Sequence, residues 1–185
     1  VSWADSWKQV RGRILKGEWY EVYDHVEFFA KYNPRLVPLF NSVLEQEVAA
    51  YRLINNQICQ ITDENEIRSI QDAMDHTDRF SPVAEHIKSA VQLLTDRSNP
   101  DYRNSIKESI SAVESAAKII TNNSSAELGK ILKYLEKTEK INGALSKGFS
   151  AIYGWTSDQN GIRHGMLDEP NLKQSDAKFF LVICS

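Results

Sequence analysis

Residues 102–114 read YRNSIKESISAVE and open a long run of helical spacing. Apolar side chains recur in this run every three or four residues, which places them on one face of a helix. They are Ile106, Ile110, Val113, Ala117 and Ile120. The same spacing recurs along almost the whole chain, so the sequence predicts a mainly all-α fold with about eight helices.

A second face of this helix carries small and polar side chains. Ser105, Glu108, Ser109 and Ala112 share that face because they are three or four residues apart. Small side chains let another helix approach closely, so we interpret the face as a packing surface. The alternative is a supporting role for Glu108 in a functional site.

Two amphipathic helices are expected before residue 33. Gly17 separates them, and Asn33-Pro34 ends the second, because the residue before a proline avoids helical geometry. The pattern places their aromatic residues in the core, with an interface as the alternative. These residues are Trp3, Trp7, Trp19 and Tyr20.

Further helices are expected after Pro38, from Asp63, from Ser81 and around Leu128. Asp63 with Glu66 has the spacing of a capping box. Ser81-Pro82 has the composition of a helix start, because a serine oxygen accepts an amide proton and proline suits the first turn. We also expect Thr138 to cap the helix that carries Phe149.

Residues 51–62 read YRLINNQICQIT and interrupt the helical pattern. Short apolar and β-branched runs flank Asn55-Asn56, and asparagine tolerates the positive φ of a tight hairpin turn. The sequence therefore predicts one small β-hairpin. A helix with a polar kink is the alternative.

Composition limits the class of protein. The chain has 185 residues, 42% of them apolar and 25% charged, with a formal net charge of −3. These values indicate a soluble globular domain and argue against a globally basic nucleic-acid binder. Cys59 and Cys184 form no CxxC pair, and no signal peptide or membrane span is visible, so we expect a cytoplasmic protein. The apolar run 179–184 suggests that the last helix continues beyond Ser185.

The segment 154–173 is polar and lacks helical spacing. It contains Arg163, a cation suited to phosphate, and His164, which can transfer a proton near neutral pH. Together they could cleave a phosphodiester. The alternative is that they hold the loop to the bundle, for example through Asp158 or Asp168.

Other chemical signals are weaker. The neighbours of the other histidines do not indicate a catalytic or metal-binding role; these histidines are His25, His76 and His86. The sequence holds no HExxH, no GxxxxGK[ST] and no GxGxxG after a strand. We therefore expect no metal and no cofactor.

Three segments carry a resemblance to a known family: SIKESISAVES at 105–115, IYGWTSDQNGIRHG at 152–165 and SDAKFFLVICS at 175–185. They resemble the C-terminal region of bacterial abortive-infection proteins of the AbiJ type. That region is similar to the HEPN superfamily. The resemblance covers roughly residues 101–185.

The resemblance implies an antiparallel helical bundle that forms a homodimer and acts on RNA without a metal. In active members four to six residues separate an arginine from a histidine that follows it. His164 falls on the family histidine, the family arginine falls at Ser157, and its common asparagine neighbour falls at Asp158. Arg163 is the available substitute for the missing arginine.

These observations predict two parts. Residues 1–100 form an accessory helical segment with the hairpin near 51–62, and residues 101–185 form the HEPN-like bundle. The expected function is phage defence by RNA cleavage at His164 and Arg163, with Ser157, Asp158 and Glu108 supporting. The alternatives are an inactive interaction or dimerisation module, and a nucleotide-binding module, in a defence or stress system.

Overall fold

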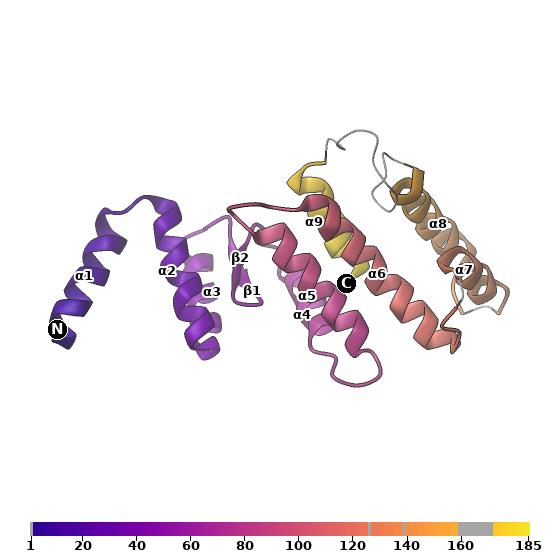
Figure 1. Cartoon of the computed structure of the whole chain (residues 1–185), viewed down its shortest axis with the longest axis horizontal. Coiled ribbons are helices and arrows are strands. Elements are labelled where there is room, and N and C mark those ends of the chain that lie inside the picture. The colour runs from indigo at the N-terminus through magenta and orange to yellow at the C-terminus, as the bar shows by residue number, and fades with distance from the viewer. Residues whose placement is uncertain (1, 126, 139, 159–171) are drawn as a thin grey trace. The chain divides into compact units, whose positions relative to one another are not determined.

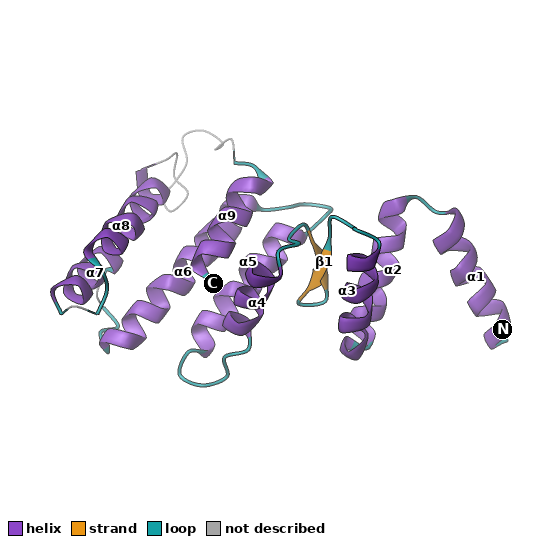
Figure 2. Ribbon diagram, turned by 180° about the vertical axis from the view of Figure 1, so that it is seen from behind, coloured by secondary structure: helices purple, strands orange, loops and turns teal. Residues whose placement is uncertain are grey.

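The protein is represented by a computed structural model, which describes residues 2–125, 127–138, 140–158 and 172–185. They form two compact units, Val1–Thr62 and Asp63–Ser185. Helices dominate both units, and a two-stranded sheet is the only sheet among the described residues (Figures 1 and 2). The predicted mainly all-α fold is confirmed.

The first unit begins with the two expected helices. They are α1 (Trp3–Lys16) and α2 (Trp19–Tyr32), and the short 3-10 helix η1 (Pro34–Leu36) leads into α3 (Val37–Gln46). Gly17 ends α1 as predicted, and the chain passes very close to itself there. A Cβ atom on Gly17 would lie 2.5 Å from the carbonyl oxygen of Arg13, so only glycine fits without a backbone shift.

The predicted hairpin is present, with β1 (Arg52–Ile54) paired antiparallel to β2 (Gln57–Cys59). Asn55 and Asn56 form its turn with φ values of 51° and 60°, in the left-handed region that asparagine tolerates. Helices hold both strands. The amide of Leu53 donates to Asn41 Oδ1 at 2.7 Å, and the amide of Ile58 donates to Glu27 Oε1 at 2.7 Å.

The expectation of a buried aromatic core near the start of the chain is wrong. Trp3, Trp7, Trp19 and Tyr20 are all exposed, and α1 has no buried residue. Helical spacing shows which face of a helix is apolar, but it does not show whether another element covers that face. In this unit the core lies instead around Ala30, Leu53 and Ile58, between α2, α3 and the hairpin.

The second unit is built around α6 (Tyr102–Thr121). This helix packs against α5 (Ser81–Thr95) and α9 (Gln174–Cys184), and α4 (Glu64–Met74) packs against the same two helices. Next along the chain, α7 (Leu128–Lys137) packs on α6, and α8 (Gly143–Asp158) packs on α7. The segment assigned to residues 1–100 thus contributes α4 and α5 to the unit that contains α6.

The small-residue face of α6 is a packing surface, as we interpreted it. Ser105, Ser109 and Ala112 are buried, and Ser105 Oγ donates to the carbonyl oxygen of Ala90 on α5 at 2.8 Å. Ser109 Oγ donates to the carbonyl oxygen of Ser105 at 2.9 Å. Both buried hydroxyls therefore have hydrogen-bond acceptors, one on α5 and one within α6.

Helix ends were predicted with mixed success. Asp63 caps α4 as expected, since its side chain accepts from the amides of Asn65 and Glu66. The expected start at Ser81-Pro82 is also confirmed, since α5 begins at Ser81 and Pro82 lies in its first turn. The cap residue is Phe80, whose amide donates to Asp78, so the hydroxyl of Ser81 is not the cap. Thr138 ends α7 and does not start α8.

Candidate functional site

The predicted catalytic pair lies in the connection between α8 and α9. Ser157 and Asp158 are the last two residues of α8, and their side chains are not among those described. Arg163 and His164 lie outside the described residues. The roles assigned to these four residues stay predictions.

The helices on either side of this connection touch through one pair of aromatic rings. The ring of Trp155 near the end of α8 stacks on Phe180 of α9, with centroids 5.2 Å apart and planes 21° apart. Thr156 is fully buried, and its hydroxyl donates to the carbonyl oxygen of Tyr153 at 2.8 Å. At the other side, the amide of Lys173 donates to Asp176 Oδ2 at 2.8 Å where α9 begins. Both flanks of the predicted site are therefore fixed by ordinary packing and capping contacts.

Glu108, predicted as a supporting residue, contacts a histidine that sequence reasoning set aside. His86 Nδ1 on α5 lies 2.7 Å from Glu108 Oε2 on α6, and the two side chains are 34% and 24% exposed. The carboxylate orients the imidazole ring and occupies Nδ1, which leaves Nε2 for another partner. Because 22 positions separate the residues, only the helix packing reveals the pair. In the sequence, the only indication of this contact was the position of Glu108 on the face of its helix that packs against another helix.

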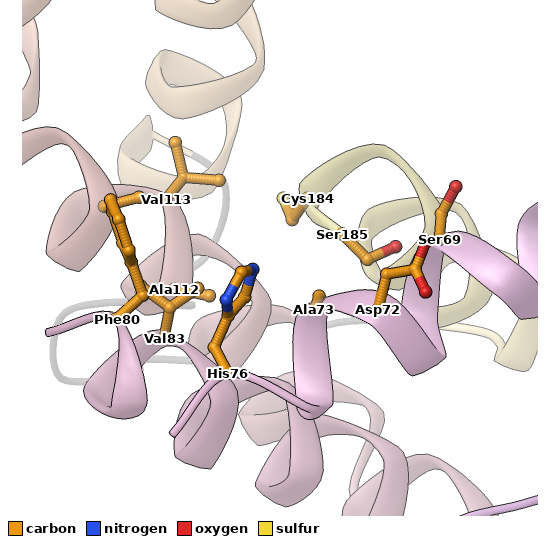
Figure 3. A pocket seen from close by; sticks show the side chains of 11 residues that line it. Ser69, Asp72, Ala73, His76, Phe80, Val83, Ala112, Val113, Cys184 and Ser185 are labelled. Atoms are coloured by element: carbon orange, nitrogen blue, oxygen red, sulfur yellow. The ribbon is translucent and has the colours of Figure 1, made fainter. Parts of the chain in front are cut away.

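A cavity of about 450 Å³ lies in the second unit among α4, α5, α6 and α9. Its apolar lining residues are Ala73, Phe80, Val83, Ala112, Val113 and Ala116. The other lining residues are Ser69, Asp72, His76, Cys184 and Ser185. Figure 3 shows the ring of His76 pointing into the space between Val113 on α6 and Cys184 at the end of α9.

The polar groups of this cavity suit hydrogen bonding more than covalent chemistry. Burial raises the pKa of the Cys184 thiol to about 12, so the sulfur is protonated at neutral pH and is a poor nucleophile. His76 and Asp78 approach only to 4.0 Å, and both side chains are more than half exposed. The arrangement can hold a small ligand, but no described residue there is activated for attack.

Within residues 2–125, 127–138, 140–158 and 172–185, no group of three His, Cys, Asp or Glu residues could hold a metal ion. In the same ranges, no helix has the length and apolar character that crossing a membrane requires.

Comparison with known families gives one result for the N-terminal part. Residues 2–76 match AbiJ N-terminal domain 4. The match runs from α1 through α4 and associates the chain with AbiJ-type abortive-infection proteins. It lies N-terminal to residues 101–185, for which the HEPN-like assignment stays a prediction. No curated protein and no solved structure matches the chain.

Proposed function

We propose that the chain is a phage-defence protein that cleaves RNA without a metal, using His164 and Arg163 of the region 101–185. The observation that carries this proposal is the match of residues 2–76 to an N-terminal domain of AbiJ proteins. The remaining part resembles the C-terminal region of the same proteins. The N-terminal and the C-terminal part of the chain thus both indicate AbiJ proteins, and they follow each other in the order that AbiJ proteins have.

The proposed chemistry is in-line cleavage of a phosphodiester. His164 removes the proton from a ribose 2′-hydroxyl, the 2′ oxygen bonds to phosphorus, and the bond to the 5′ oxygen breaks. The products are a 2′,3′-cyclic phosphate and a 5′-hydroxyl, whose oxygen takes up a proton. Arg163 neutralises the charge that grows on the phosphoryl oxygens. In this proposal Ser157, Asp158 and Glu108 act around this pair as supporting residues.

An inactive interaction or nucleotide-binding module is the second candidate, and two observations favour it. Ser157 stands where the resemblance places the family arginine. Glu108 is engaged by His86 in the packing of α5 on α6, which gives that carboxylate a structural role. Under this candidate the polar segment after α8 binds a partner or a nucleotide and breaks no bond.

The proposal is tested with the purified full chain and single-stranded RNA in the presence of EDTA. We expect cleavage that ends in cyclic phosphates. His164→Ala should abolish it, and Arg163→Ala should lower the rate by a factor on the order of 10²–10³. His76→Ala is the matched control, because His76 is an exposed histidine of the second unit outside the predicted pair.

Two outcomes would overturn the proposal. Cleavage that survives in the His164→Ala variant would show that another group does the chemistry. A wild-type chain that leaves RNA intact would favour the second candidate. Thermal unfolding with and without nucleotides would then distinguish a nucleotide-binding module from an interaction module. A ligand at about 100 times its Kd adds roughly 2.7 kcal/mol to the free energy of unfolding.

A further inference from the structure

The exposed surface of α7 consists of lysines and one aromatic residue. Four residues of this helix are exposed, and they are Lys130, Lys133, Tyr134 and Lys137. Because the later three lie three, four and seven positions after the first, all four side chains are on one side of the helix. We call these four residues the lysine face of α7.

The opposite side of α7 belongs to the core of the second unit. Its buried residues pack with Ala117 of α6, and they are Leu128, Ile131, Leu132 and Leu135. This packing fixes which side of the helix is turned outward. The apolar side chains of α7 are therefore used within the molecule, and the lysine face is the part that another molecule can reach.

The lysine face keeps an excess of positive charge. Among the described residues, two acidic residues belong to α7 or adjoin it. Glu127 Oε2 lies 3.6 Å from Lys130 Nζ, but the two side chains are 73% and 74% exposed, and so exposed an ion pair is weak. The other carboxylate is directed away, because Glu136 Oε1 would lie 2.9 Å from a Cβ atom on Gly143 at the start of α8. Three lysines thus face solvent together in a chain whose net charge is −3.

Lysines on both sides of an exposed aromatic ring fit single-stranded RNA. An ammonium group binds a phosphate as a point charge, and each phosphate that is neutralised releases counterions, which strengthens binding. Single strands expose their bases, and an aromatic side chain offers a base a surface for stacking. Tyr134 is 51% exposed and lies between Lys133 and Lys137 in the sequence.

Two other partners fit this face less well. A helix that lies on an anionic membrane inserts apolar side chains among the lipids, whereas the apolar residues of α7 are buried in the core of its own unit. A protein partner would cover the lysines, and lysine is depleted in interfaces between proteins. The phosphates of RNA are therefore the ligand that the lysine face matches best.

We propose that the lysine face of α7 binds the phosphate backbone of single-stranded RNA, with a base stacked on Tyr134. The choice of RNA rests on the proposed function, and the face holds the substrate of that reaction without taking part in bond cleavage. The helix that packs on α7 is α8, and the connection that contains Arg163 and His164 follows α8 in the chain. The inference assigns substrate binding to residues outside the predicted catalytic pair.

The test measures binding separately from cleavage. It uses the purified full chain and a labelled single-stranded RNA whose 2′-hydroxyls are methylated. This RNA keeps its phosphates and bases but lacks the nucleophile for cleavage, so its binding does not require the activity of His164. We expect the logarithm of Kd to rise with the logarithm of the salt concentration, with a slope of about 0.7 for each phosphate bound. Failure here would overturn the binding surface, whereas cleavage of unmodified RNA tests the catalytic pair.

Replacing lysine by glutamine removes the charge and keeps much of the length of the side chain. The triple variant Lys130→Gln/Lys133→Gln/Lys137→Gln should raise the Kd at least about tenfold at low salt and lower the slope by about 2. Lys107→Gln is the matched control, because Lys107 is an exposed lysine of α6 outside the lysine face. This control should leave the Kd and the slope unchanged.

Two further changes test the ring and the neighbouring carboxylate. Tyr134→Ala should raise the Kd at least about fivefold without changing the slope, because stacking on a base releases no counterions. Tyr134→Phe keeps the ring and should bind as the wild type does. Glu127→Gln removes the anion that competes with phosphate for Lys130, so it should lower the Kd about twofold.

Three outcomes would overturn the proposal. The first is a wild-type chain that does not bind the methylated RNA even at low salt, where phosphate contacts are strongest. The second is binding whose Kd and slope are the same in the wild type and in the triple lysine variant. The third is a chain that binds vesicles of anionic lipid through these lysines but binds no RNA, which would assign the lysine face to a membrane surface.

Discussion

Val48 is a β-branched residue in the left-handed region, with φ of 52°, just after α3. The amides around it close the helix end, where Ala49 donates to the carbonyl oxygen of Leu44 at 2.8 Å. A left-handed conformation costs an L-residue roughly 1–2 kcal/mol, and asparagine and glycine tolerate it best. The side chain of Val48 is 88% exposed, so it offers little packing in return.

We therefore expect Val48→Asn to raise the free energy of unfolding by about 1 kcal/mol, measured by urea denaturation. Asn122→Gly is the matched control, because Asn122 adopts φ of 51° at the end of α6 and already tolerates it. That variant should change the stability by less than about 0.5 kcal/mol. A loss of stability in Val48→Asn would show that Val48 makes a favourable contact that outweighs the strain.

At the scale of the element, the pair of His86 and Glu108 joins α5 to α6. Hydrogen bonds to charged groups contribute about 1.5–3 kcal/mol when buried, and partial exposure reduces this value. We expect His86→Ala and Glu108→Gln each to lower the free energy of unfolding by about 1 kcal/mol. In the double variant the two losses should not add, because both remove the same contact.

The control for this pair lies on the same helix. Lys88 and Glu85 approach to 3.2 Å within α5, with Glu85 largely exposed. Lys88→Ala should therefore cost less than about 0.5 kcal/mol. Losses that add fully in the His86 and Glu108 double variant would contradict a role for their contact in holding α5 to α6.

In the whole molecule, the second unit depends on α6, which packs against α5, α7 and α9. Ile106 has no exposed surface, whereas Ile120 on the same helix is half exposed. Ile106→Ala should lower the free energy of unfolding by about 2–5 kcal/mol, because it leaves a cavity that neighbours cannot fill. Ile120→Ala, the control, should lower the free energy of unfolding by less than about 1 kcal/mol. Both losses are measured by thermal unfolding followed by far-UV circular dichroism. Equal losses in the two variants would show that the burial of Ile106 does not determine the stability of the second unit.

Most of the fold was predictable because its signals are local. Apolar side chains at intervals of three and four indicate a helix whatever covers it, and Asn55-Asn56 supplies the positive φ of the hairpin turn. Helix ends were less predictable. Thr138 was expected to begin the helix that carries Phe149 but ends α7 instead, since several nearby groups compete to bind the free amides of a first turn.

The candidate site was predictable only in part. The polar segment 154–173 was predicted to be a loop between two helices, but its first five residues, 154–158, are helical and belong to α8. His164 lies outside the described residues, so its role stays a prediction. The pairing of His86 with Glu108 was not predicted, although Glu108 was placed on the packing face of its helix. Their contact depends on the angle and the level at which α5 crosses α6, which no spacing within either helix determines.

By itself, the sequence determined which segments are helices, where the hairpin turns and which face of each helix is apolar. These properties follow from backbone preferences and side-chain spacing within a few residues. The tertiary structure decided which apolar faces are covered: it left Trp3 and Trp7 exposed and buried Ser105 against α5. Burial depends on elements distant in sequence, so neither outcome can be derived from periodicity alone.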